Sequence, residues 1–67
     1  MTSSDRPLRI VLADDAVLLR EALAASLSAA GFEVAGQAGE VDGLMVLVER
    51  EAPDVAVVDV RMPPTNT

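Results

Sequence analysis

Apolar and polar positions divide the chain into five blocks, three of strand length and two of helix length. Residues 8–13 form a short, largely apolar run that stops at two adjacent aspartates. Residues 32–37 and 54–59 are two further short runs containing valine, and glycine or proline residues lie next to them. Short apolar runs bounded by turn residues are typical of strands. The pattern therefore predicts three strands in these ranges.

Two helices are predicted between the strands. Residues 16–30 are rich in Leu and Ala and contain no Gly or Pro, which is typical of an amphipathic helix. Asp15 lies where an N-cap is expected, and Gly31 lies where a helix usually ends. From residue 40 the helical spacing returns, and Pro53 stops it. The positions expected to be buried are Leu19, Leu23 and Leu27, with Ala16, Ala22 and Ala30, in the first helix, and Val41, Leu44, Met45 and Val48 in the second. The side chains expected to lie largely off the first stripe are Arg20, Glu21, Ser26 and Ser28.

The order of the elements predicts the fold class. Strand, helix, strand, helix, strand with short connections is typical of parallel βαβ units with right-handed crossovers. Strands that are apolar on both sides need helices on each face, since neither face then meets water. We therefore expect an α/β fold in which residues 8–67 form one domain after a flexible leader at residues 1–7. Residues 60–67 are Pro-rich and are expected to form an exit loop.

Composition narrows the classes of function. The 67 residues include no Cys and no His, which excludes disulfides, thiolate metal sites and His-dependent nucleophile triads within them. The formal charge is −6, with five scattered arginines and no lysine, which argues against nucleic acid as the partner of these residues. No apolar run approaches the ~20 residues that span a bilayer, and the start does not resemble a signal peptide. We therefore expect a soluble, cytoplasmic domain with no membrane contact.

Three aspartates follow predicted strands at their carboxyl ends. Asp14 and Asp15 follow the first strand, and Asp59 ends the third. Ligand sites in open parallel sheets form beyond these ends, and neighbouring strands lie about 4.8 Å apart, so the three side chains converge if the two strands are adjacent. Three like charges in one small volume require a proton or a cation, and Mg²⁺ suits this donor set best. Taken singly, each acid could equally cap a helix or begin a turn.

A carboxylate beside Mg²⁺ has several uses. It can be a passive ligand, a base or a nucleophile, and attack of Asp59 on phosphorus would yield an aspartyl phosphate. No base is needed to activate it, because a carboxylate is already ionised at neutral pH.

These residues resemble the N-terminal half of a response-regulator receiver domain of two-component signalling. The likeness covers nearly the whole chain from residue 8, and residues 60–65 look most like regulators with a C-terminal LuxR/NarL-type DNA-binding domain. The resemblance implies the doubly wound, flavodoxin-like (βα)5 fold, of which this chain holds three parallel strands in the order 2-1-3 and two helices. The residues that carry the likeness are Asp14-Asp15 after the first strand, Asp59 after the third, and Met62-Pro63 in the following loop.

The resemblance also implies roles for individual residues. Asp59 would accept a phosphoryl group from the phosphohistidine of a sensor histidine kinase. Asp15 would bind Mg²⁺ directly, Asp14 would help through water, and Asp59 and the backbone carbonyl of Arg61 would be further ligands. Met62 and Pro63 would shape the loop below the site.

The likeness is incomplete, so alternatives stay open. The switch Ser or Thr of strand four and the Lys of strand five lie outside this chain, and Pro64 stands where many receivers have Gly. The first expectation is a non-enzymatic phosphoryl-accepting receiver that controls transcription through a DNA-binding output domain absent from this chain. The alternative is a phosphorylation-incompetent pseudo-receiver that acts as an interaction or dimerisation module. A metal-dependent phosphohydrolase would need an Asp-x-Asp arrangement, which Asp59-Val60-Arg61 lacks.

The third strand also predicts a contact surface. Strand order 2-1-3 leaves it at an edge of the sheet, and residues 55–58 are apolar and uncharged. Unprotected edge strands tend to pair with other chains. We therefore expect self-association through this edge.

Overall fold

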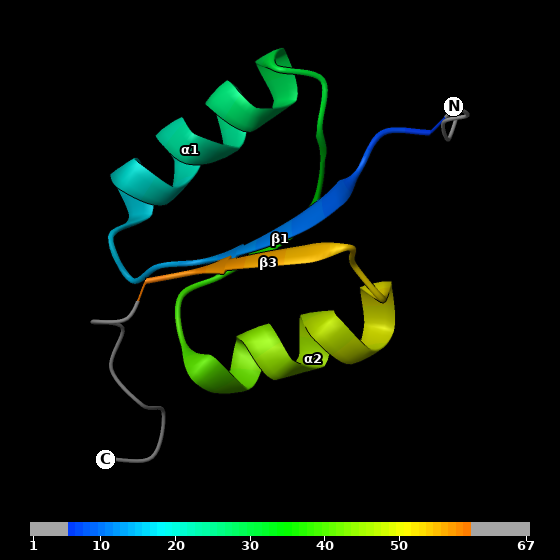
Figure 1. The fold of residues 1–67 in the computed structure, drawn as a ribbon. Coiled ribbons are helices and arrows are strands. Elements are labelled where there is room, and N and C mark those ends of the chain that lie inside the picture. Colours follow the sequence, from blue (N-terminus) through cyan, green and yellow to red (C-terminus); the bar gives the residue numbers. More distant parts are fainter. Residues whose placement is uncertain (1–5, 60–67) are drawn as a thin grey trace.

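The computed structural model describes residues 6–59, in which strands and helices alternate (Figure 1). The strands form one parallel sheet in the order β2-β1-β3. The predicted α/β fold and its strand order 2-1-3 are therefore confirmed. Most of the predicted leader and the whole predicted exit loop lie outside the described residues. The elements are β1 (Arg9–Ala13), α1 (Val17–Ala29), β2 (Glu33–Ala38), α2 (Val41–Glu51) and β3 (Val55–Val58).

The two helices lie on opposite faces of the sheet, α1 on one and α2 on the other (Figure 1). β1 is the central strand, with β2 and β3 on its two edges and a helix over each face. Residues 10–13 are accordingly buried, with Val11 and Leu12 almost fully enclosed. The core lies between the sheet and α2 and comprises Val11, Ala13, Ala38, Leu44 and Leu47. Among the described residues, no helix has the length and apolar character needed to cross a membrane.

α1 differs from its prediction at its start and in its burial. Its N-cap is Ala16 rather than Asp15, because the Asp14 carboxylate accepts the Ala16 N–H at 2.9 Å and the helix begins after that turn. Gly31 has φ +101° just beyond the helix end, as expected of a terminating glycine. The predicted stripe is not buried: Leu19 and Leu23 remain about half and two-fifths exposed. α1 packs mainly on β2 and β1, which leaves these leucines beside an open cavity toward β3.

α2 is rotated relative to its prediction. Leu44 is buried as expected, but the second buried residue is Leu47, and Met45 is 53% exposed. The interpretation of Met45 as a core residue was therefore wrong. The cause lies on β2, where Gly36 leaves space for the Leu47 side chain: a Cβ on Gly36 would lie 2.6 Å from a Leu47 methyl carbon. Gly36 thus lies inside β2.

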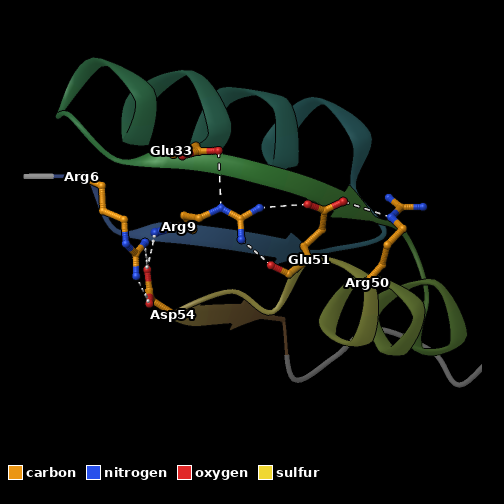
Figure 2. A network of polar contacts seen from close by, with 6 residues as sticks. All are labelled: Arg6, Arg9, Glu33, Arg50, Glu51 and Asp54. Carbon is orange, nitrogen blue, oxygen red and sulfur yellow. Dashed lines mark hydrogen bonds and ion pairs between the residues drawn. The ribbon is translucent and has the colours of Figure 1, made fainter.

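A network of charged side chains joins the elements at the amino ends of the strands (Figure 2). The Arg9 side chain on β1 forms ion pairs with Glu33 on β2 at 3.5 Å and with Glu51 at the end of α2 at 2.9 Å, and it also donates to the Glu51 backbone carbonyl. The Arg9 N–H donates to the Asp54 carboxylate, which pairs with Arg6. Arg9 therefore links all three strands and α2 at the end of the sheet opposite Asp14 and Asp59.

Hydrogen bonds within this network favour the ionised forms of two carboxylates, Glu51 and Asp54. Hydrogen bonds from Arg50 and then Arg9 lower the pKa of Glu51 below its ordinary value. The Arg9 backbone N–H and then the Arg6 side chain lower the pKa of Asp54 in the same way. Both carboxylates are thus held in the charged form around Arg9.

Candidate functional site

The pairing of β1 with β3 brings two of the predicted aspartates to one edge of the sheet. Ala13 on β1 lies opposite Val58 on β3, so the residues that follow them are neighbours. The Asp59 N–H donates to the Ala13 carbonyl at 2.9 Å, which extends the ladder to the last described residue. The Asp14 N–H donates to the Ala38 carbonyl at 3.0 Å, which links the end of β1 to the end of β2. Backbone bonds to neighbouring strands thus fix both aspartates.

Asp14, Asp15 and Asp59 form a three-acid cluster. One carboxylate oxygen from each residue can be chosen so that all lie within 4.8 Å of one another. Asp14 is buried, with 7% of its surface exposed, Asp59 is partly buried and Asp15 is exposed. The start of α1 contributes to this arrangement, because the Ala16 N–H holds one oxygen of Asp14 and leaves Asp15 free of a capping role.

The cluster fits a hard divalent cation. Ligand oxygens on opposite sides of one Mg²⁺ are about 4 Å apart, close to the spread of these three oxygens, and carboxylates are among its preferred ligands. A bound cation would offset the repulsion among the three carboxylates, and the sequence contains no lysine that could do so. The exposed position of Asp15 also leaves one side of the cluster open to solvent, where water or a phosphate oxygen could complete the coordination.

An open cavity of about 210 Å³ adjoins the cluster between α1 and the β1–β3 pair. Its surface is mostly apolar, and Asp14, Asp59 and Arg20 supply the charged groups at its lining. Its apolar lining consists of Leu12, Ala13, Leu19, Leu23, Val57 and Val58.

Arg20 is the charged residue at this edge that sequence reasoning missed. The helical pattern placed it largely off the buried stripe, yet its guanidinium donates to the Asp14 carbonyl at 2.9 Å and to the Gln37 side chain at 3.1 Å. The only signal in the sequence is charge, because no other basic residue occurs between Arg9 and Arg50. The remaining predicted site residues, Arg61, Met62 and Pro63, lie outside the described part of the chain.

Comparison with known proteins identifies the family. Residues 10–66 match the family described as response regulator receiver domain. The chain is 44% identical over 62 residues to protein-glutamate methylesterase/protein-glutamine glutaminase 5 of Anaeromyxobacter dehalogenans, covering 91% of this chain and 17% of that protein. It is 39% identical over 57 residues to the transcriptional regulatory protein PdtaR of Mycobacterium tuberculosis, covering 85% of this chain and 28% of that protein.

A third relative agrees with the subfamily resemblance. The chain is 39% identical over 56 residues to the probable transcriptional regulatory protein NarL of Mycobacterium tuberculosis, covering 82% of this chain and 26% of that protein. The chain thus spans 17% to 28% of the length of these relatives. The matched family, the parallel sheet ordered 2-1-3 and the acids at its carboxyl edge agree with one another. The chain belongs to the response regulator receiver family.

Proposed function

We propose that this chain is the phosphoryl-accepting part of a two-component response regulator, with Asp59 as the acceptor. The observation that carries the proposal is the three-acid cluster at the carboxyl edge of the sheet. Receiver domains are signalling modules rather than metabolic enzymes, and this role needs a nucleophile and a cation site side by side. Asp59 would supply the nucleophile, because it lies at the carboxyl edge and lines the cavity beside the cluster.

The reaction transfers one phosphoryl group from the phosphohistidine of a sensor histidine kinase. A carboxylate oxygen of Asp59 attacks the phosphorus, a P–O bond forms, the P–N bond breaks, and the imidazole nitrogen keeps the bonding electrons. Asp14, Asp15 and Asp59, with the Arg61 carbonyl, would hold Mg²⁺, and Met62 and Pro63 would shape the adjoining loop. The bound Mg²⁺ would supply positive charge opposite the transferring phosphoryl group.

The output of the signal belongs to the proposal as well. Two of the relatives are named as transcriptional regulators, which supports control of transcription. A cytoplasmic location is part of the same proposal. The charge of −6 argues against DNA contact by these residues, so DNA would be bound through a separate domain of the regulator.

Self-association is the second part of the proposal. Within residues 6–59, β3 has a strand partner on one side only, and Val55, Val57 and Val58 are each about two-fifths exposed. A second copy of the chain could pair with this uncharged edge. This contact also supports the alternative function, a pseudo-receiver that acts by dimerisation and takes no phosphate.

Intact-protein mass decides between the two functions. The chain is incubated with Mg²⁺ and phosphoramidate, whose P–N bond resembles that of phosphohistidine, beside the variants Asp59→Asn and Asp42→Asn. We expect one added phosphoryl group in the unmodified chain and in Asp42→Asn, none in Asp59→Asn, and none when Mg²⁺ is removed with a chelator. No addition to the folded chain at any Mg²⁺ concentration would reject the proposal and favour the pseudo-receiver.

A further inference from the structure

Arg20 reaches from α1 across the carboxyl edge of the sheet. Its Nη1 donates to the backbone carbonyl of Asp14 at 2.9 Å, and its Nε donates to Oε1 of Gln37 on β2 at 3.1 Å. The guanidinium also passes close to Gly39, where a Cβ would lie 3.1 Å from Nη1. A planar guanidinium with donors in a fixed fork is well suited to such a two-point contact. Arg20 therefore connects α1, the end of β1 and the end of β2.

The direction of the Asp14 carbonyl affects where Asp15 lies in the site. This oxygen belongs to the planar peptide group that joins Asp14 to Asp15, so its direction sets the direction in which the chain enters Asp15. The Asp14 N–H is already fixed by Ala38, and its side chain by Ala16. The bond from Arg20 fixes the remaining polar group, and with it the peptide plane.

We infer that Arg20 is a positioning residue for the three-acid cluster: by holding the Asp14–Asp15 peptide, it keeps the Asp15 carboxylate directed toward Asp14 and Asp59. The inference rests on the proposed function only for its consequence, the binding of Mg²⁺. The positioning itself is a property of the protein without metal. Arg20 contacts a backbone oxygen of Asp14 and acts on the cluster through it.

Arg20 could affect Mg²⁺ affinity through its charge or through the position in which it holds the Asp14–Asp15 peptide. The two roles predict opposite changes in affinity when Arg20 is removed, so the direction of the change tests the inference. A positive charge near the cluster repels Mg²⁺. If Arg20 acted through its charge alone, its removal would strengthen Mg²⁺ binding, and this gain would be smaller at high salt. A positioning role makes its removal weaken binding, because the three oxygens no longer converge. Loss of an outer-shell partner of a metal site typically costs about 10-fold to 100-fold in affinity.

The first measurement is Mg²⁺ binding by calorimetry to the unmodified chain, Arg20→Met and Arg20→Lys. We expect Arg20→Met to weaken binding by about 10-fold or more, and Arg20→Lys, which keeps the charge and one donor to the carbonyl, to restore part of the loss. Leu47→Ala is the control for stability, because it removes core packing from α2 without touching this edge. It should leave the affinity of the folded fraction unchanged. Unchanged or tighter binding in Arg20→Met would overturn the inference.

The second measurement uses no metal. Amide hydrogen exchange of Ala16, whose N–H is bonded to the Asp14 carboxylate, should become faster in Arg20→Met, while that of Ala52 at the end of α2 should not change. If the unmodified chain binds no Mg²⁺, the metal site of the proposed function fails, yet Ala16 exchange still decides whether Arg20 orders this loop. If Arg20→Met does not fold, Gln37→Leu takes its place. It removes the second anchor of the guanidinium, and equal Ala16 exchange in Gln37→Leu and the unmodified chain would contradict the inference.

Discussion

Gly36 shows how one missing side chain sets the packing of a helix. It lies within β2, and Leu47 of α2 occupies the volume that a larger residue would need. Leu47 is 7% exposed, whereas Met45 on the same helix is 53% exposed. The glycine therefore selects which of two apolar positions of α2 faces the sheet.

We expect Gly36→Ala to lower the free energy of unfolding by about 1–3 kcal/mol, the usual cost of overpacking a core. Urea unfolding followed by circular dichroism measures the change. In a Leu47→Ala background the added methyl group meets empty space, so the same substitution should cost much less. An equal cost in both backgrounds would show that backbone conformation, and not the Leu47 contact, makes alanine unfavourable at this position.

At the scale of single elements, Arg9 gathers charges at the amino ends of the strands (Figure 2). Glu51 and Asp54 each have a lowered pKa there, so folding favours their ionised forms. A lowered carboxyl pKa stabilises the fold at pH values above the ordinary pKa, which is 4.5 for Glu51 and 3.8 for Asp54. This contribution is lost as the pH falls through the lower pKa values of the folded state.

Glu51→Gln should therefore destabilise the chain near neutral pH and lose this effect in acid. The two unfolding free energies, from urea titrations at a series of pH values, should converge as the pH falls below 4.5, the ordinary pKa of Glu51. Glu49→Gln, the same change at an exposed position of α2, is the matched control for the loss of one charge. A constant difference between Glu51→Gln and the unmodified chain at all pH values would contradict the assignment of the ion pairs.

The order of elements and the meeting of Asp14 with Asp59 could be predicted, because both follow from local patterns and from the rule that parallel strands share a carboxyl edge. The rotation of α2 could not, since a helical stripe is broad enough to include Met45 or Leu47, and the space that Gly36 leaves for Leu47 lies across the interface on another element. The reach of Arg20 was missed for a similar reason. A long side chain can leave its own helix face, and its partner here is a backbone oxygen that no sequence pattern marks.

At the scale of the whole molecule, apolar surface is distributed unevenly over the sheet. β1 is buried, whereas every residue of β3 is exposed, and Leu19 and Leu23 of α1 border the cavity beside it. A chain of 67 residues is close to the lower limit for burying enough surface to fold alone. Covering β3 would therefore add burial to the described part of the chain.

We expect light scattering at micromolar concentration to give a mass above that of one chain, and Val55→Lys to shift it toward the monomer, because a charge on an edge strand opposes pairing. Leu18→Lys is the matched control, since Leu18 is 83% exposed and lies on α1, outside the sheet. A compact folded monomer before any substitution would reject self-association. If only Leu18→Lys, and not Val55→Lys, removed the larger species, the contact between chains would lie on α1 rather than on β3.

The register of β1 against β3, which sets Ala13 opposite Val58, would couple the proposed cation binding to the pairing of these two strands. Asp14 and Asp59 come from the first and last strands, so a cation that needs both binds only chains in which those strands have paired. By mass action, a free concentration 100 times the dissociation constant then stabilises the paired state by about 2.7 kcal/mol. The folded fraction would then rise with the concentration of the ion.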